Sequence, residues 1–286
     1  MRAIRDFKDY ELLDCSGGEK LERWGEWVLV RPDPQIIWET PRGEAWARAC
    51  ARYHRSSAGG GHWEFAGLPQ KEWTVSWKEL TFKISPTGFK HTGLFPEQAV
   101  NWEWIQERIR SAGRPLSILN LFAYTGGATL AAASAGARVC HVDASKGIVG
   151  WARENAALSG LSQRPIRWIV DDCRKFVERE IRRGVRYDGI ILDPPSYGRG
   201  PGGEVWQLEE KIYPLLELLC GVLSDEPSFI MLNSYTAGLS AQVMQYLLSV
   251  TAGRRFGGRA EAEEIGLPVT ASGLCLPCGS TAIWTA

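Results

Sequence analysis

Short apolar runs alternate with stretches of helical periodicity along most of the chain. The apolar runs are residues 117–122, 138–142, 167–170, 189–192 and 228–232. The stretches with apolar side chains at helical spacing are residues 128–135, 146–158, 174–183, 205–222 and 241–251. Near-continuous apolar strands that alternate with helices are typical of a parallel sheet covered by helices on both faces. We therefore predict a doubly wound α/β fold, with a hairpin over 265–286 that adds antiparallel strands at one edge.

Residues 1–95 have a different pattern, in which short apolar runs are separated by turn formers. The runs are residues 27–30, 36–38, 73–77 and 80–84. The alternation of Trp73, Val75 and Trp77 indicates a strand, and the three glycines within 56–61 indicate a flexible loop. A helix from Pro96 to about Gly113 then leads into the α/β pattern. We predict a small β-rich domain over 1–85 and an α/β domain over 86–286.

Composition narrows the class of protein. The chain has 286 residues, of which 44% are hydrophobic, so it can form a globular core. Its 33 basic and 33 acidic residues exclude a protein that holds nucleic acid by bulk charge alone. Seven cysteines without paired spacing and a start without an apolar leader favour reduced thiols in the cytoplasm. The uncharged stretch 115–137 is interrupted by polar residues and glycines, so we expect no membrane segment.

The first strand of the α/β region runs into a turn that contains two glycines. Its sequence is Phe122-Ala123-Tyr124-Thr125-Gly126-Gly127. In a doubly wound sheet, ligands bind beyond the carboxyl ends of the strands, where glycine lets the backbone approach them. The turn lacks the G-x-G-x-x-G spacing that holds a pyrophosphate, which disfavours a dinucleotide. Taken alone, it could equally be a tight structural turn.

Acidic residues follow the next two strands. Asp143, in Asp143-Ala144-Ser145, can accept hydrogen bonds from both hydroxyls of a ribose. Alternatively, Asp143 or Ser145 caps the following helix. The third strand ends in Asp171-Asp172-Cys173, where one acid can accept from an adenine amino group while the other caps a helix. The glycine-containing turn after the first strand and the acidic residues after the next two strands together indicate a nucleoside pocket.

The fourth strand ends in Asp193-Pro194-Pro195-Ser196-Tyr197. Two prolines fix the backbone and remove two donors, so the Pro194 carbonyl is held free beside the Asp193 carboxylate. This pair can accept both hydrogens of a planar amine, while an aromatic ring such as Tyr197 stacks on the base. The alternative is a rigid strand exit with Tyr197 as a packing residue.

The complete series resembles the class I S-adenosylmethionine (SAM)-dependent methyltransferases. More narrowly, it is similar to bacterial large-subunit ribosomal RNA methyltransferases, whose first motif reads L-N-x-F-x-Y-T-G and whose fourth reads D-P-P-x-F/Y. The resemblance extends upstream to residues 88–98 and covers roughly 80–240. Residues 1–80 match only loosely the small β-rich appendages of related proteins.

The resemblance implies SAM as cofactor and a set of site residues. The methionine part would be lined by Phe122, Ala123, Tyr124, Thr125 and Gly126. The ribose would lie at Asp143, Ala144 and Ser145, and the adenine at Asp171, Asp172 and Cys173. Phe95 and Gln98 would cover the cofactor from the other side. Asp193, Pro194 and Tyr197 would face the methyl group and the acceptor, which makes them the candidate catalytic residues.

The acceptor is expected to be a nitrogen. Methylation at a pyrimidine C5 needs a cysteine thiolate to activate the ring, and related C5 enzymes carry it after the fourth or fifth strand. Here Ser196 and the segment Asn233-Ser234-Tyr235-Thr236 occupy those places. RNA, ribosomal RNA in particular, is the favoured substrate. The alternatives are an N-methyltransferase of proteins or small molecules and a non-catalytic SAM- or RNA-binding module. The oligomeric state stays open.

Two further patterns are weaker indications of a functional site. Cys275-Leu276-Pro277-Cys278 has no companion ligands at metal-site spacing, so we interpret it as small buried side chains and expect no metal. Residues 108–187 hold 14 basic and 6 acidic side chains, concentrated on the helix that begins near Arg174. Most such helices are solvated faces, although this one could contact RNA phosphates.

Overall fold

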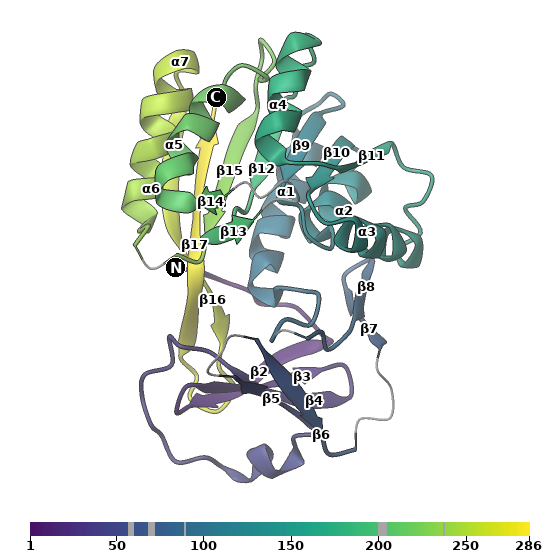
Figure 1. Ribbon diagram of the computed structural model, residues 1–286, viewed down its shortest axis with the longest axis vertical. Helices are drawn as coiled ribbons and strands as arrows, with labels where there is room; N and C mark the ends of the chain where they lie inside the picture. The colour runs from purple at the N-terminus through teal and green to yellow at the C-terminus, as the bar shows by residue number, and fades with distance from the viewer. Residues whose placement is uncertain (57–59, 68–71, 89, 200–204, 237) are drawn as a thin grey trace. The chain divides into compact units, whose positions relative to one another are not determined.

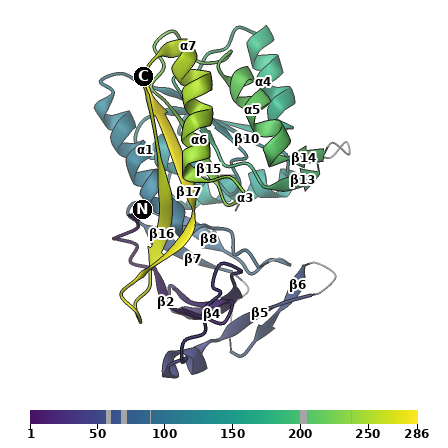
Figure 2. The ribbon, with the colours of Figure 1, turned by 90° about the vertical axis from the view of Figure 1, so that its left-hand side faces the viewer.

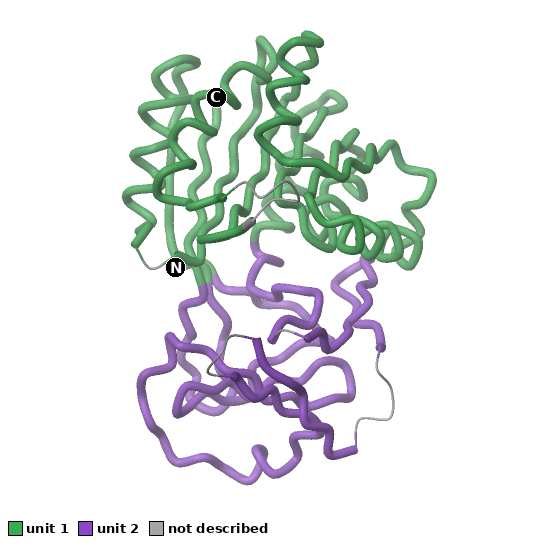
Figure 3. The backbone as a smooth tube through the Cα atoms, viewed as in Figure 1, with its two compact units in different colours: residues 1–2, 101–265, 279–286 green, residues 3–100, 266–278 purple. Residues whose placement is uncertain are grey.

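The computed structural model describes residues 1–286 except 57–59, 68–71, 89, 200–204 and 237. The chain forms two compact units, shown in Figure 3. Unit 1 comprises residues 1–2, 101–265 and 279–286, and unit 2 comprises residues 3–100 and 266–278. The domain boundary expected after residue 85 stays a prediction. No helix in the described parts of the chain is long and apolar enough to cross a membrane.

Over the described residues, unit 1 is built on an eight-stranded sheet (Figure 1). Its strand order is β1-β16-β17-β15-β12-β9-β10-β11. The parallel strands are β9 (Ser117–Leu121), β10 (Arg138–Asp143), β11 (Ile166–Val170), β12 (Gly189–Leu192) and β15 (Phe229–Ser234). The other edge holds β17 (Cys275–Thr285), antiparallel to β15, then β16 (Arg259–Pro268) and β1 (Arg2–Ala3). The predicted parallel sheet with an antiparallel edge is confirmed.

Helices cover both faces of this sheet (Figures 1 and 2). One face carries α1 (Ala99–Ser111), α2 (Gly127–Ser134) and α3 (Lys146–Leu158), with α2 in contact with both α1 and α3. The other carries α4 (Cys173–Arg182), α5 (Leu208–Leu219) and α6 (Ala241–Leu248), whose apolar side chains join a buried cluster with strand residues such as Leu121, Val142 and Leu192. All four residues of β12 are buried, as expected of a strand covered on both sides.

The order of the parallel strands creates a switch point at β9. From β9 the chain moves outward to β10 and β11, and it then returns to the opposite side of β9 as β12. The loops that leave β9 and β12 therefore diverge, and in doubly wound sheets the ligand crevice lies at this place, beyond the carboxyl ends of the strands. This is where the motifs of the first and fourth strands come together.

Several element boundaries differ from the sequence expectation, and the following differences change how the elements are assigned. The helix expected over 205–222 begins only at Leu208, because Val205–Gln207 forms strand β14 and pairs with β13 (Tyr197–Arg199). The helix expected to end at 251 passes into a π-helical turn, η3 (Ser249–Gly253), and a short α7 (Arg254–Phe256). The terminal hairpin begins at Arg259 rather than at 265. Val205, Trp206 and Leu208 are compatible with either periodicity, so pairing with β13 decides the structure.

Unit 2 is β-rich, as predicted. Its described residues form a sheet in the order β2-β3-β4-β5-β6 and a separate hairpin of β7 (Trp73–Trp77) and β8 (Leu80–Ile84). The sheet strands are β2 (Tyr10–Ser16), β3 (Glu19–Trp24), β4 (Trp27–Pro32), β5 (Ala51–Arg55) and β6 (Gly61–Phe65). The apolar run 36–38 is not a strand, and its carbonyls accept hydrogen bonds from Gly17 and Gly18. Residues 57–59 of the expected flexible loop lie outside the described residues.

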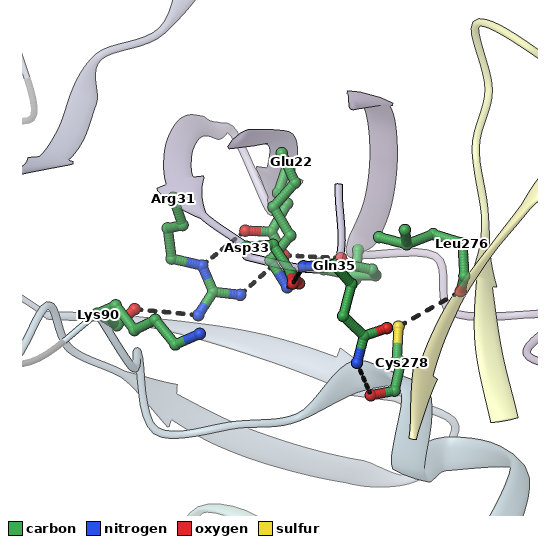
Figure 4. Close-up of polar contacts among 9 residues, drawn as sticks. Glu22, Arg31, Asp33, Gln35, Lys90, Leu276 and Cys278 are labelled. Carbon is green, nitrogen blue, oxygen red and sulfur yellow. Dashed lines mark hydrogen bonds and ion pairs between the residues drawn. The ribbon is translucent and has the colours of Figure 1, made fainter. Parts of the chain in front are cut away.

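A buried ion cluster ties the strands of unit 2 together (Figure 4). The Arg31 guanidinium donates to both oxygens of the fully buried Glu22 carboxylate, at 2.6 and 2.7 Å. Tyr10 donates a third hydrogen bond to Glu22 at 2.8 Å, and Lys20 lies 3.6 Å from it. Desolvation alone would raise the pKa of Glu22, but these cationic and hydrogen-bonding neighbours lower it to about 2. Glu22 is therefore ionised inside the unit.

Candidate functional site

The loop from β9 to α2 has an unusual backbone. Phe122 and Tyr124 have φ of 53° and 48°, and Gly126 has φ of 92°. The left-handed region is unfavourable for aromatic residues, costing of order 1–3 kcal/mol each, and such strain is concentrated at functional sites. Neighbouring elements hold the loop in place. Ala123 donates to the Val142 carbonyl at 3.1 Å, and Asn155 of α3 donates to the Thr125 carbonyl at 2.9 Å.

The two glycines of this loop are needed for close packing. A Cβ on Gly127 would lie 2.6 Å from the Trp102 ring of α1, and one on Gly126 would lie 3.2 Å from Ala152 of α3. Gly126 also occupies the left-handed position that begins α2. A side chain at either position would displace a helix, so both glycines are required for the packing of the loop against α1 and α3.

Asp143, at the end of β10, is attached to this loop. Its Oδ2 accepts from the Tyr124 amide at 3.0 Å and its Oδ1 accepts from the Ser145 amide at 2.9 Å. Burial raises the pKa of the Asp143 carboxyl, and the two amide hydrogen bonds oppose that rise. Each oxygen keeps a second lone pair for a ligand hydroxyl. Of the two residues considered as helix caps, Ser145 is the cap, because its Oγ accepts from the Ile148 amide; Ala144 is exposed.

The end of β11 joins the same group. The Asp171 amide donates to the Asp143 carbonyl at 3.1 Å, and the Asp171 carboxylate forms an ion pair with Arg179. Asp172 caps α4 by accepting from the Lys175 amide at 2.9 Å, as one alternative predicted. The buried Cys173 Sγ accepts from the Phe122 amide at 3.4 Å, and burial raises the pKa of this thiol. The structure thus brings the first three motifs to one edge.

The segment after β12 forms the far side of the crevice. Asp193 is half-buried, Pro194 is buried, and Tyr197 is 54% exposed. Among the described residues nothing donates to the Pro194 carbonyl, whereas the Pro195 carbonyl accepts from Trp206 Nε1 at 2.6 Å. Ser196 Oγ lies 2.5 Å from Thr236 Oγ1, so the loops after β12 and β15 are linked by hydroxyls.

Trp206 is the main residue of this region that the sequence analysis did not identify. Its ring centroid lies 5.0 Å from that of Phe122, so it contacts the β9 loop as well as the segment after β12. We assigned Trp206 to a helix, although Gly200-Pro201-Gly202-Gly203 is a turn signal just before it. That signal predicts the hairpin β13–β14, but not the contact with Phe122.

Phe95 and Gln98 belong to unit 2. The centroids of the Phe95 and His91 rings lie 5.2 Å apart. Gln98 is buried at the end of the short η2 (Pro96–Gln98), and its backbone amide donates to the Phe95 carbonyl. Their part in a cofactor site stays a prediction. The thiols of Cys275 and Cys278 are free, and within the described ranges no group of three or more His, Cys, Asp or Glu side chains is placed to hold a metal ion.

Comparisons with known proteins agree with this geometry. The profile of the S-adenosylmethionine-dependent methyltransferase family matches residues 35–222. The crystal structure of the SAM-dependent methyltransferase from Agrobacterium tumefaciens is 38% identical, with a TM-score of 0.94 over 99% of this chain and 92% of that one. A putative methyltransferase solved in complex with SAH shares the fold at 17% identity, with a TM-score of 0.76 over 98% of this chain and 76% of the other.

A curated relative carries a more specific name. Ribosomal RNA large subunit methyltransferase K/L from Shewanella frigidimarina is 32% identical over 155 residues. That alignment covers 54% of this chain but only 21% of the relative. The chain therefore spans about a fifth of the length of the curated relative, and the resemblance expected from the sequence motifs is confirmed for that part.

Proposed function

The chain belongs to the S-adenosylmethionine-dependent methyltransferase family, and from that premise we propose that it methylates a nitrogen of RNA, with ribosomal RNA as the favoured substrate. The enzyme class and the cofactor follow from the family. The acceptor atom, the substrate and the roles of individual residues are the content of the proposal.

The proposed site offers a partner for each part of the cofactor. SAM supplies an electrophilic methyl group on a sulfonium centre. Its methionine part is proposed to lie against the β9 loop, Phe122–Gly126, whose glycines let the loop pack closely on α1 and α3. Asp143 has a lone pair on each oxygen for the ribose hydroxyls, and Asp172 has a second oxygen for the adenine amino group. Phe95 and Gln98 are proposed to complete the site.

One observation supports a nitrogen acceptor most strongly. The loops that follow β12 and β15 meet through the hydroxyls of Ser196 and Thr236, and no cysteine lies in either loop. Cys173, on the cofactor side, is buried with a raised pKa, so its thiol is neutral at pH 7. A covalent C5 mechanism needs a thiolate at the acceptor, whereas transfer to nitrogen needs only orientation and loss of a proton.

The residues after β12 can provide both the orientation of the acceptor nitrogen and a destination for its proton. The Asp193 carboxylate and the Pro194 carbonyl accept the two hydrogens of a planar amine and direct its nitrogen lone pair along the axis of transfer. Tyr197, half exposed, stacks on the base. The proton released from the nitrogen passes to the Asp193 carboxylate or to water.

The name of the curated relative supports RNA as the substrate class. It implies a cytoplasmic enzyme, because ribosomes are assembled there. The alternative acceptors, a protein or a small molecule, use the same chemistry and differ only in what enters the crevice beside Tyr197.

Incubation with methyl-labelled SAM tests the proposal. Purified enzyme is given total RNA or total protein from cells that lack it, and the label in each pool is counted. We expect label in RNA, with a control in which the RNA is digested beforehand. Label confined to protein or to small molecules would refute the RNA assignment.

A further inference from the structure

A pocket with polar and apolar walls lies in unit 1, away from the candidate site. It has a volume of about 250 Å³ and is formed by the end of α3, the loop that follows it, and β11. Its polar walls are Arg153, Ser162 and Arg164, and its apolar walls include Ile166 and Trp168. Because β11 is the edge strand of the sheet, this side of the unit has no further strand beyond it in the described chain.

The pocket is separate from the proposed cofactor site. Ile166 begins β11, whereas Asp171 follows its last residue. A strand rises roughly 3.3 Å per residue, so these positions are on the order of 15 Å apart. The cofactor crevice lies at the carboxyl ends of the strands, and the pocket lies toward the amino end of β11.

The pocket carries positive charge without compensation. The exposed side chains of Arg153 and Arg164 form no ion pair with any described residue, and no acidic residue lines the pocket. On α4, the helix considered above for RNA contact, Arg174 pairs with Glu178 and Arg179 with Asp171, whereas Arg182 forms no ion pair with a described residue. Arg183, which follows the helix, pairs with Glu180. Both guanidiniums of the pocket are therefore available to an anionic ligand.

One wall of the pocket is a fixed aromatic ring. Trp168 is half-buried, and its ring packs at 4.9 Å against the fully buried His141 of β10. His141 is neutral, because burial and the nearby charge of Arg153 lower its pKa to about 3. Its Nδ1 is bound to Thr129 at 2.9 Å, which fixes the imidazole behind the indole. A rigid aromatic ring beside cationic groups is the combination that binds single-stranded nucleic acid.

We propose that this pocket binds one unpaired nucleotide of the RNA substrate, outside the reaction site. The two guanidiniums hold its phosphate, Ser162 can add a hydroxyl contact, and the base lies against the Trp168 indole. The volume of about 250 Å³ is below the roughly 300–1,000 Å³ that is usual for pockets of drug-sized ligands, so the proposed ligand is no larger than one nucleotide. This inference rests on the proposed RNA substrate, and it makes the pocket an anchor that determines which RNA segment reaches Asp193.

The test compares two pairs of substitutions. Arg153→Ala with Arg164→Ala removes the phosphate contacts, and Arg174→Ala with Arg182→Ala removes the same charge from α4. Affinity for a labelled, mixed-sequence 12-nucleotide RNA is measured by fluorescence anisotropy at several salt concentrations. We expect the pocket pair to weaken binding at least tenfold and to reduce the salt slope by about 0.7, which is the contribution of one neutralised phosphate in a single strand. The α4 pair should change affinity less than twofold. Equal effects of the two pairs would overturn the proposal.

The aromatic wall is tested independently. Trp168→Phe keeps a ring, whereas Trp168→Leu keeps only apolar volume, so the first should bind RNA within threefold of the parent and the second about tenfold more weakly. SAM affinity and melting temperature verify the fold, and if the Leu variant does not fold, the arginine pair decides. Equal binding by both variants would contradict stacking.

Two controls distinguish a failure of the proposed function from a failure of the pocket assignment. Methyl labelling of RNA by the parent enzyme tests the proposed function, while the variants test the pocket. If the parent methylates RNA and the arginine pair has no effect on binding, only the pocket assignment is wrong. If the pocket variants lose affinity for free AMP but keep affinity for RNA, the pocket binds nucleotides and the RNA assignment is overturned. A parent that neither binds nor methylates RNA refutes both.

Discussion

At the residue scale, the residues proposed to bind the cofactor also stabilise the fold. Asp143 accepts from two backbone amides, Asp172 caps a helix, and Cys173 accepts from the Phe122 amide. The sequence predicted that these residues follow successive strands, because the local pattern of apolar residues shows where each strand ends. It did not predict which residues they contact, such as Arg179 with Asp171, because these contacts depend on how separate elements pack.

Asp143 is the residue on which cofactor affinity should depend most. Asp143→Ala removes the proposed acceptors of both ribose hydroxyls, and hydrogen bonds to a charged group contribute about 1.5–3 kcal/mol each. We therefore expect SAM affinity, measured by calorimetry, to fall at least tenfold. Asp143→Asn is the matched control, because it keeps one acceptor oxygen and should lie between the parent and the alanine variant. Unchanged affinity in the alanine variant would remove the ribose from this position.

Asp193 should affect turnover rather than binding. Asp193→Ala leaves the amine of the acceptor without one of its two orienting oxygens, and loss of a positioning group commonly lowers the rate on the order of a hundredfold. SAM affinity should stay within about threefold of the parent. Single-turnover kinetics and calorimetry measure the two quantities separately. A variant that turns over as fast as the parent would place the reactive centre elsewhere.

At the scale of elements, the local pattern of apolar residues predicts the bounds of an element wherever its periodicity fits only a helix or only a strand. The helix over 146–158 and the strand over 189–192 have the predicted bounds, because each has a clear period and a clear stop. The hairpin β13–β14 was missed, since Val205 and Trp206 fit either a helix or a strand until Tyr197–Arg199 pairs with them. Pairing across a turn is not encoded in the local periodicity.

The hairpin makes Trp206 a testable positioning residue. Its indole donates to the Pro195 carbonyl and packs on Phe122, so it links the segment after β12 to the β9 loop. We expect Trp206→Ala to lower kcat about tenfold by loosening the acceptor segment, while Trp206→Phe keeps the ring contact and loses only the hydrogen bond. Burst kinetics with the methyl-accepting RNA would compare them. An alanine variant with unchanged kcat would make the contact merely structural.

At the scale of the whole molecule, two units with different architectures share one chain, and each has its own buried core. The change of pattern near residue 95 predicted two parts, but not that residues 266–278 of the terminal hairpin fall in unit 2. That grouping comes from long-range contacts. Thr270 and Ala271 donate to the carbonyls of Leu12 and Leu13, some 258 residues earlier in the chain.

The ion cluster of unit 2 should make its stability depend on pH. The pKa of Glu22 is lowered to about 2 in the folded unit, below its ordinary value of 4.5. Its contribution is therefore fully present above pH 4.5 and is lost as pH falls toward 2. Glu22→Gln leaves Arg31 buried without its anion, and we expect a loss on the order of 3–5 kcal/mol at pH 7.

Thermal melting curves between pH 7 and pH 3 would measure this dependence of stability on pH. The parent should lose stability steeply below pH 4.5, whereas Glu22→Gln should be weakened throughout and show a smaller slope. Glu64→Gln, at an exposed carboxylate paired with His54, is the control and should change little. Parallel pH profiles for the parent and the Glu22 variant would contradict the assignment of an ionised, stabilising Glu22.

The position of the transferred methyl group tests the central claim most directly. RNA labelled by the parent enzyme is digested to nucleosides, and the labelled nucleoside is identified by mass spectrometry against synthetic standards. The same assay is run with Asp193→Ala and with RNA that contains 5-fluoropyrimidines. We predict an N-methylated nucleoside, strongly reduced product in the Asp193 variant and no covalent trapping by the fluorinated RNA. A C5-methylated pyrimidine, or enzyme trapped on the fluorinated RNA through one of its cysteines, would contradict the account.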